Sequence, residues 1–473
     1  MRNSSQSDFR YDILIISDDV VGPRMAGPGI RCWEMAKTLA RHFRVALAIP
    51  DYSYSPDKNT FFQALPFSLF RYSLGQPRLI KELTAASRIL IAQGYILSKF
   101  PFLPALPIHF VVDIYVPFVL ENLFTHRSTT PNLKDRQAIH LHDLRVFNDQ
   151  LRRGDHFLCA TARQRDLLLG CLLSLNRLTP EVVDQSPELD DLVSVVPFGI
   201  EEEDAPSTRL SRPLRLLFPQ IGEKDIILLW GGVLTNWFDP ITLLYAFQEA
   251  VQEKPRLKLV FLSTCHPNPL LPKFAMAQKA INVARELGLL NRFVFFNETW
   301  VDYPDRAAYF AEADIGVSIH QKHLETEFSF RTRILDYLKH ELPIICTEGD
   351  YFAELVAEEE LGMVVPAGGR AELKGAILRL AEDEALRGRI KEKMRPVRER
   401  YTWSRVLEPL RAHCEQVLAG KVKSWPMPLK RELKYVCLPY KQSWIKGLLK
   451  RIMGKSWVKV SWKLRAWRRR ILG

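Results

Sequence analysis

Two arginines and the acids around them form the most distinctive charged group in the sequence. They lie in the stretch 324–346, LETEFSFRTRILDYLKHELPIIC, whose apolar spacing predicts a loop, a helix capped by Ser329, and a buried strand. Arg331 and Arg333 then fall in the first helical turn, where a cation is unfavourable by ~0.3–1 kcal/mol. A bound diphosphate would remove that conflict, and Asp336 could accept hydrogen bonds from two ribose hydroxyls. The alternative is a surface pair between Arg333 and Asp336, worth about 0.2–0.5 kcal/mol.

Two acids in the first half of the chain are candidates for handling a hydroxyl proton. Asp113 directly follows the apolar residues 108–112, and Glu121 comes one predicted helix later. Either carboxylate could accept the proton of a substrate hydroxyl or orient that hydroxyl, and Asp113 is the better placed. The alternative for Asp113 is a structural role as a helix cap.

Glycines precede the first predicted helix, in the loop DDVVGPRMAGPG. Gly22, Gly27 and Gly29 make this loop a candidate anion site at a helix N-terminus, with a simple turn as the alternative. Their spacing is not G-x-G-x-x-G, so a dinucleotide site is not predicted.

Further candidates follow strands of the second half. Gly231 and Gly232 would let a ligand approach the backbone closely, while Asn297 and His320 stand at matching strand ends. The pair His320-x-x-His323 lacks a nearby third ligand, and no Asp-x-Asp follows a strand. We therefore expect no bound metal and no other cofactor.

Short apolar runs separated by helical patterns must position these residues. This alternation is typical of doubly wound sheets, which bind ligands beyond the C-terminal ends of their strands. The predicted strands are residues 11–17, 45–49, 68–72, 89–92, 108–112, 156–160, 193–196, 226–230, 258–263, 293–296, 315–319 and 343–347.

The length of 473 residues predicts two domains and an appendage. A charged, proline-containing stretch at 201–225 divides a first α/β domain, residues 1–205, from a second α/β domain, residues 206–420. We expect the two domains to face a cleft, and the last helix, about 402–419, to be able to pack back on the first domain.

The charge of the chain is concentrated at its end. Residues 421–473 hold 16 Lys and Arg against one acid, so this tail carries a net charge of +15. Because the whole chain carries +12, the first 420 residues carry 12 − 15 = −3. Apolar residues with tryptophans recur at helical spacing in 443–453 and from 456 onward, which predicts helices lying in a membrane surface. The alternatives are packing on the first domain and binding to nucleic acid.

Composition indicates the compartment. Seven scattered cysteines without a C-x-x-C pair favour reduced thiols. The first twelve residues contain no apolar core of a signal peptide, and no apolar run is long enough to span a membrane. We therefore expect a cytoplasmic protein bound peripherally to the inner face of the cell membrane.

Several segments together resemble group 1 glycosyltransferases (family 4), which have the GT-B architecture. The resemblance covers roughly residues 10–420 and is carried by MAGPGIRCWEMAKTLA, VVPFGI, ILLWGG, FRTRILDYLKHELPIICTEGD and LGMVVPAGG. In that family a Glu-x7-Glu motif contacts the donor sugar and the ribose. Asp336 matches its second Glu, whereas Phe328 occupies the first position and Glu327 is one residue away.

The resemblance assigns roles to the candidates. The family's Arg and Lys after the first strand of the second domain have no counterpart in GGVLTNWFDPIT, so we predict that Arg331 and Arg333 hold the diphosphate instead. The predicted catalytic residues are Asp113, Glu327, Arg331 and Arg333; the donor-binding residues are Gly231, Gly232, Asn297, His320, Glu327, Phe330, Arg331, Thr332, Arg333 and Asp336; and the acceptor-side residues are Gly27, Gly29, Asp113 and Glu121.

The resemblance implies metal-independent transfer of a sugar, with retention at the anomeric carbon. The donor would be a nucleotide-diphosphate-sugar and the acceptor a glycan or lipid-linked molecule, in the synthesis of a cell-surface polysaccharide. The competing hypotheses are a nucleotide-sugar epimerase or hydrolase of the same fold, because fold does not determine chemistry, and a nucleic-acid-binding protein that uses the basic tail.

Overall fold

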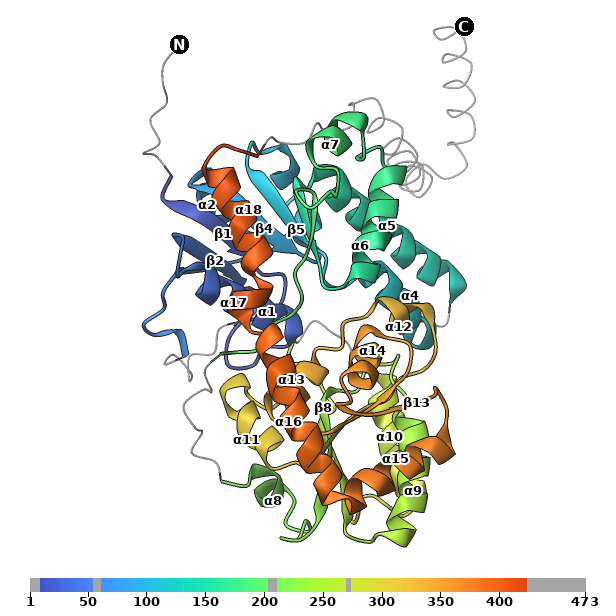
Figure 1. The fold of residues 1–473 in the computed structure, drawn as a ribbon. Coiled ribbons are helices and arrows are strands. Elements are labelled where there is room, and N and C mark those ends of the chain that lie inside the picture. The colour runs from blue at the N-terminus through green and yellow to red at the C-terminus, as the bar shows by residue number, and fades with distance from the viewer. Residues whose placement is uncertain (1–8, 54–60, 131, 203–210, 269–273, 423–473) are drawn as a thin grey trace, which may run out of the picture.

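Two α/β domains lie one above the other in the computed structural model (Figure 1). The structure describes residues 9–53, 61–130, 132–202, 211–268 and 274–422. Each domain is built on one parallel sheet with helices on its faces. This confirms the predicted architecture of two tandem doubly wound domains.

The first sheet has the strand order β3-β2-β1-β4-β5-β6-β7, and every pairing in it is parallel. Its strands are β1 (Tyr11–Ile16), β2 (Val45–Pro50), β3 (Ser68–Tyr72), β4 (Ser87–Gln93), β5 (His109–Asp113), β6 (His156–Cys159) and β7 (Val193–Val195). Most of these strands are apolar runs that are buried along their length, as expected for a parallel sheet covered on both faces.

Helices cover both faces of the first sheet (Figure 1). They are α1 (Gly27–Leu39), α2 (Arg78–Ala85), α3 (Ile96–Lys99), α4 (Phe118–Thr129), α5 (Leu133–Arg153), α6 (Ala162–Ser174) and α7 (Pro180–Gln185), with short 3₁₀ turns at Asp51–Ser53 and Leu103–Ala105. Helix α1 begins close under the loop that precedes it. A Cβ at Gly29 would lie only 1.9 Å from the carbonyl oxygen of Val20, so a glycine is required for this approach.

The second sheet has the order β10-β9-β8-β11-β12-β13 and is also parallel. Its strands are β8 (Ile226–Val233), β9 (Leu257–Ser263), β10 (Val294–Phe296), β11 (Ile315–Ser318), β12 (Ile344–Thr347) and β13 (Gly362–Val365). Strand β13 was not among the strands expected from the sequence. Every strand that was expected is present, with ends shifted by at most a few residues.

The second domain contains both short and long helices. They are α8 (Pro213–Leu217), α9 (Pro240–Glu253), α10 (Ala275–Glu286), α11 (Arg306–Ala311), α12 (Leu324–Phe328), α13 (Arg333–Lys339), α14 (Tyr351–Glu358), α15 (Arg370–Glu382) and α16 (Glu384–Arg400), with a 3₁₀ turn at Tyr303–Asp305. In the described part of the chain, none of the helices combines the length and apolar character that crossing a bilayer requires.

The chain returns to the first domain after α16. Helices α17 (Trp403–Val406) and α18 (Glu408–Leu418) lie over that domain in Figure 1, and α18 packs on β4 and β7. Three histidines sit at this contact: Nε2 of His413 is 2.9 Å from Nε2 of His109, and its ring stacks on that of His156 with a centroid distance of 3.7 Å. Helix α18 is thus part of the first domain's structure.

Candidate active site

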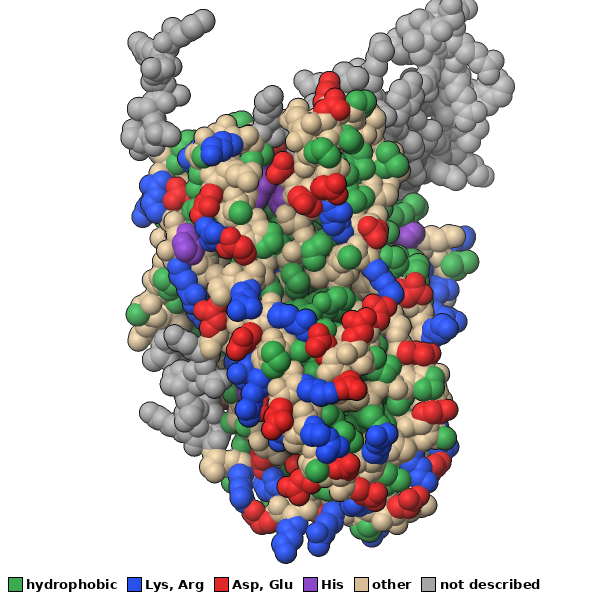
Figure 2. Space-filling view, in the orientation of Figure 1, with side chains coloured by type: hydrophobic (Ala, Val, Ile, Leu, Met, Phe, Trp, Pro, Cys, Tyr) green, Lys and Arg blue, Asp and Glu red, His purple; other side chains and the backbone are tan. Residues whose placement is uncertain are grey.

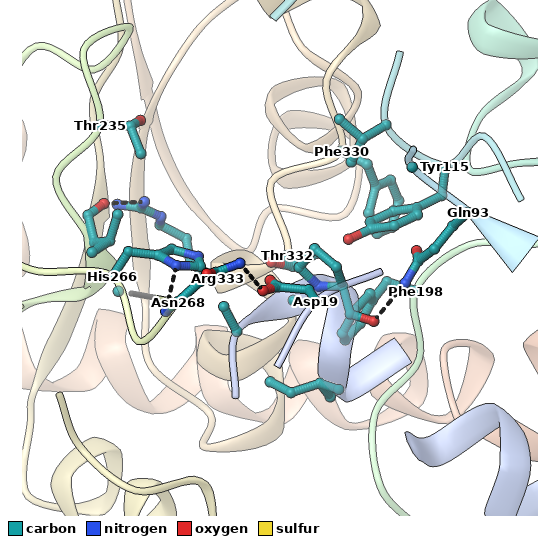
Figure 3. A pocket seen from close by; sticks show the side chains of 18 of the residues that line it. Asp19, Gln93, Tyr115, Phe198, Thr235, His266, Asn268, Phe330, Thr332 and Arg333 are labelled. Carbon is teal, nitrogen blue, oxygen red and sulfur yellow. Dashed lines mark hydrogen bonds between the residues drawn. The ribbon is translucent and has the colours of Figure 1, made fainter. Parts of the chain in front are cut away.

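A cavity of about 580 Å³ lies between the two domains. Its walls come from the loops that follow strands of both sheets, which is where doubly wound sheets bind ligands. Figure 3 shows this convergence: the first domain contributes Asp19, Gln93, Tyr115 and Phe198, and the second contributes Thr235, His266, Asn268, Phe330, Thr332 and Arg333.

The structure brings most of the predicted residues together at this cavity. Those that line it are Gly27, Asp113, Glu121, Gly231, Gly232, Phe330, Arg331, Thr332, Arg333 and Asp336. Across the cleft, a Cβ at Gly27 would lie 4.0 Å from the hydroxyl oxygen of Thr332. The loops of the two domains therefore approach each other at this point.

Four predicted residues lie outside the cavity wall. Gly29 serves the packing of α1, as described above. Asn297 is buried and holds its own loop through Leu262 and Thr299, which it contacts at 3.0 Å and 2.8 Å. His320 is fully buried, with Nε2 3.3 Å from Oδ2 of Asp350. These three residues shape the scaffold around the site.

Glu327 is the fourth, and the structure places it differently from the expectation. It lies on α12 with an exposed side chain. The acid that points inward from α12 is Glu325, which is buried and contacts Arg331. The sugar contact predicted for Glu327 therefore has no support in this geometry.

The expected helix also begins later than its spacing suggested. Ser329 does not cap it; its hydroxyl donates to the carbonyl oxygen of Thr326, and α13 begins at Arg333. Arg331 therefore lies in the loop between α12 and α13 and not in a helical turn. The predicted conflict between two cations and one helix dipole applies to Arg333 alone.

Arg331 is already paired on both sides of its guanidinium. Its Nη1 and Nη2 donate to Oε1 and Oε2 of Glu325 at 2.9 Å and 2.7 Å, and Nε lies 3.8 Å from Oδ2 of Asp350. A buried bidentate pair of this kind holds a loop in place. Arg331 therefore contributes to the cavity wall mainly as part of a neutralised group.

Arg333 has the opposite environment. Among the described residues that line the cavity, it is the one Lys or Arg without a carboxylate partner. It donates to the carbonyl oxygen of Val233 at 3.1 Å, lies 4.0 Å from the ring centre of Phe238, and leaves Nη1 without a partner. Burial lowers its pKa to about 10, so it remains a cation at neutral pH. This free cation is suited to an anionic ligand.

Asp336 lies near Arg333 and is paired with another arginine. Its Oδ2 accepts a short charge-assisted hydrogen bond from Arg306, which also lines the cavity. Burial raises the pKa of Asp336, while Arg306 opposes that effect. The second carboxylate oxygen is left for a ligand.

Asp113 and Glu121, the two acids predicted for the acceptor side, also differ in whether their carboxylates are paired. Asp113 accepts from Nε and Nη2 of Arg31 at 2.6 Å and 2.9 Å, so both its oxygens are occupied. The Glu121 carboxylate has no hydrogen bond or ion pair within the part of the chain that the structure describes. Burial raises the pKa of Glu121 to about 7, and the charge of Glu325 adds to that effect.

Several cavity residues were not predicted from the sequence. Thr235, Trp237 and Trp300 line it, and each has a buried hydroxyl or indole N–H without a partner among the described residues. Asn268 donates from Nδ2 to Oδ1 of Asp19 at 2.6 Å, which joins the two domains beside the cavity (Figure 3). Burial raises the pKa of Asp19 to about 6. Their common signal in the sequence is a position just after a predicted strand.

No group of three or more His, Cys, Asp or Glu side chains suited to holding a metal ion occurs within the described ranges. His323, the partner of His320 in the H-x-x-H pair, instead stacks on Phe124 of α4 at a ring distance of 4.2 Å. This stack is a further contact between the domains.

Comparison with known proteins gives a family match for the second domain and the fold of the chain. Residues 224–383 match the model of the group 1 glycosyl transferases, and no curated protein matches the chain in sequence. The match falls on the second domain and confirms the resemblance found in the sequence.

Solved structures with the same fold cover most of the chain. Sucrose-phosphate synthase from Thermosynechococcus elongatus is 16% identical with a TM-score of 0.59, over 87% of this chain and 100% of that one. WaaG, a glycosyltransferase involved in lipopolysaccharide biosynthesis, is 16% identical with a TM-score of 0.57, over 86% and 100%. HepE of Anabaena in complex with UDP-glucose is 15% identical with a TM-score of 0.60, over 87% and 100%. The chain therefore has the GT-B fold.

Proposed function

We propose that this protein transfers a sugar, with retention at the anomeric carbon, from a nucleotide-diphosphate-sugar to a hydroxyl of a glycan or lipid-linked acceptor. The family match of its second domain and the GT-B fold support a glycosyltransferase, and structures similar to it hold UDP or UDP-glucose. The observation that carries the proposal is the guanidinium of Arg333, which has no carboxylate partner among the described residues and lies at a cavity between the domains.

The chemistry asked of this site is stabilisation of a leaving group. When the bond between the anomeric carbon and the diphosphate oxygen breaks, negative charge grows on the diphosphate. A cation that is already in place stabilises this charge without reorganisation, and removal of one such donor typically costs about 2–4 kcal/mol of the barrier. Arg333 is the residue best suited to this role.

The neighbouring unpartnered donors fit the same ligand. A buried polar group without a hydrogen bond costs about 1–3 kcal/mol, which a ligand rich in oxygen atoms would remove. Thr235, Trp237 and Trp300 are such groups in the wall of the second domain. In this proposal they contact the diphosphate or the sugar, and Asp336 accepts from the ribose hydroxyls.

Product analysis of the purified protein tests the proposal. The protein is incubated with a panel of nucleotide-sugars, with and without lipid-linked acceptors, and nucleoside diphosphate and glycosylated product are measured. We expect diphosphate release that depends on acceptor, and a new glycoside whose anomeric configuration by NMR equals that of the donor. Release of free sugar alone would indicate a hydrolase, and a changed sugar on intact nucleotide would indicate an epimerase.

We further propose that the enzyme works at the inner face of the cell membrane, in the synthesis of a cell-surface polysaccharide. The basic tail, residues 421–473, supports this location, and all but its first two residues lie outside the described residues. On the face shown in Figure 2, Lys and Arg side chains alternate with Asp and Glu, so that face offers no continuous basic surface. Attraction of about 1 kcal/mol per basic residue near an anionic leaflet would come from the tail.

Vesicle flotation tests the membrane proposal. The full chain is compared with one that ends at Gly420, on anionic and on zwitterionic vesicles and at two salt concentrations. We expect only the full chain to float, only with anionic lipid, and less at high salt because surface charges are screened. Equal flotation of both chains, or no effect of lipid charge, would refute it.

A further inference from the structure

We propose that Glu121 binds hydroxyl groups of the acceptor and restricts the reaction to acceptors whose reacting sugar carries no phosphate or other negative charge. This inference rests on the proposed transfer reaction and specifies the substrate that the first domain accepts. It starts from the observation that the other charged side chains in that half of the cavity are already paired or hydrogen-bonded.

The first domain presents no unpaired cation to the cavity among its described residues. Lys99, its one lining cation, lies 2.5 Å from Oδ1 of Asp18. Arg31 lies behind the wall with its side chain fully buried, and it is occupied by Asp113. A phosphate group on the acceptor would therefore find no free positive partner in this wall.

Glu121 is the acid that remains open. Asp113 is held by Arg31 at both oxygens, Asp18 is paired with Lys99, and Asp19 accepts from Asn268 and from the backbone N–H of Val20. Only Glu121 lacks a hydrogen bond or ion pair among the described acids of this wall. Its oxygens are available to accept hydrogen bonds from a ligand.

The position of Glu121 is set by contacts on both sides. Phe124, three residues later on the same face of α4, stacks on His323 of the second domain. Asn122, which directly follows Glu121, donates to Oδ2 of Asp143 on α5 at 2.9 Å and to the hydroxyl of Tyr95 at 2.9 Å. These bonds fix α4, so the carboxylate is held at the cavity wall.

The charge of Arg331 acts on Glu121 without forming an ion pair with it. Arg331 faces α4 from the second domain, but Glu325 takes both of its Nη atoms. The charges facing Glu121 are thus Glu325, which raises its pKa, and Arg331, which lowers it. An anionic group on the acceptor would be repelled here, because the carboxylates of Glu121 and Glu325 outnumber the one arginine, Arg331. The hydroxyls of a neutral sugar could instead donate hydrogen bonds to Glu121.

Acceptor kinetics with matched probes test the inference. Octyl glycosides are compared with their 6-phosphates for the wild type, Glu121→Gln, Glu121→Lys and the control Glu181→Gln, which changes an exposed glutamate on α7. For the wild type we expect kcat/KM to be about 100-fold lower for the phosphates, since like charges placed together in a site are strongly disfavoured. Glu121→Gln should raise the KM for octyl glycosides roughly 10- to 100-fold, with a smaller change in kcat.

Two further readouts complete the test. Glu121→Lys should reverse the preference in favour of the phosphates, and UDP-glucose binding by calorimetry should be the same in all four proteins. If donor binding and turnover occur but Glu121→Gln keeps the wild-type acceptor KM, or the wild type prefers phosphates, this inference fails and the proposed function stands. If the wild type neither binds nor turns over any nucleotide-sugar, the proposed function fails and this inference with it.

Discussion

The guanidinium of Arg31 clamps the carboxylate of Asp113 from α1 across to the end of β5. Nε lies 2.6 Å from Oδ2 and Nη2 lies 2.9 Å from Oδ1, while Nη1 and Nη2 also donate to the carbonyl oxygens of Pro197 and Val196. Neither residue is more than 5% exposed. Asp113 lies at the end of its strand as the sequence indicated, but this pair makes it a structural anchor in the cavity wall.

Substitution of Asp113 should therefore act mainly on folding. Asp113→Ala leaves a buried guanidinium without its partner, and we expect a loss of about 3–5 kcal/mol in the free energy of unfolding, measured by urea denaturation. The double variant Arg31→Met/Asp113→Leu should recover most of that loss, because it removes both charges. A variant Asp113→Ala with wild-type stability and no turnover would instead support a role as proton acceptor.

Arg331 and Arg333 should respond differently to the same change. Arg331→Ala leaves the buried Glu325 unpaired, so we expect a loss of about 3–5 kcal/mol in stability. Arg333→Ala removes a cation without a carboxylate partner, so its unfolding free energy should stay within about 1 kcal/mol of the wild type. Its turnover should fall by the equivalent of about 2–4 kcal/mol. Near-normal turnover of Arg333→Ala at saturating donor would contradict the diphosphate assignment.

Asp336 should affect the nucleoside half of the donor. Asp336→Asn removes a charged acceptor for the ribose hydroxyls, so UDP and UDP-glucose should both bind more weakly, by a similar factor of roughly 10 to 100. Calorimetry with the two ligands measures this, and Asp305→Asn, on the 3₁₀ turn outside the cavity wall, is the matched control. A loss confined to UDP-glucose would place Asp336 at the sugar.

The histidines under α18 predict a loss of stability in acid. Burial lowers the pKa of His109, lowers that of His156 to about 4, and lowers that of His413 further, with the neighbouring rings adding to the effect. The folded state therefore binds these protons less readily than the unfolded state, and stability should fall as the pH drops from about 6.5 to about 4. Thermal unfolding across this range should show a shallower decline for His413→Phe. Parallel curves for variant and wild type would exclude the cluster as the cause.

The sheets could be predicted because their signals are local. Apolar runs such as YDILII and IILLWGG are buried on both sides and separated by helical patterns, so every strand except β13 was visible without knowledge of the rest. The sequence located the cavity residues Gly231 and Gly232 because they follow a predicted strand, and Arg333 because it lies in the stretch 324–346. Positions next to predicted strand ends were enough to locate the cavity.

The parts that failed depend on contacts between distant or opposed residues. Helical spacing from Phe330 to Leu338 suggested a start at Ser329, but the pair Glu325–Arg331 holds that segment as a separate loop. Glu327 was chosen because it lies one residue from the first position of the Glu-x7-Glu motif, and that spacing does not report which acid of α12 is buried. The bond between Asp19 and Asn268 spans 249 positions, and no local pattern reports such a contact.

The chain leaves the first domain and returns to it at one place, so the second domain is an insertion whose two ends lie side by side. The backbone N–H of Ile200 donates to the carbonyl oxygen of Tyr401 at 2.7 Å, and the carbonyl oxygen of Ile200 accepts from the backbone N–H of Trp403 at 3.1 Å. The outgoing and returning segments of the chain therefore run side by side. Another protein's domain could be grafted here through two junctions at one place. Because α18 belongs to the first domain, a segment that begins at residue 423 leaves from the first domain. If residues 423–473 bind a membrane surface as proposed, the first domain would lie next to that surface and the second domain farther from it.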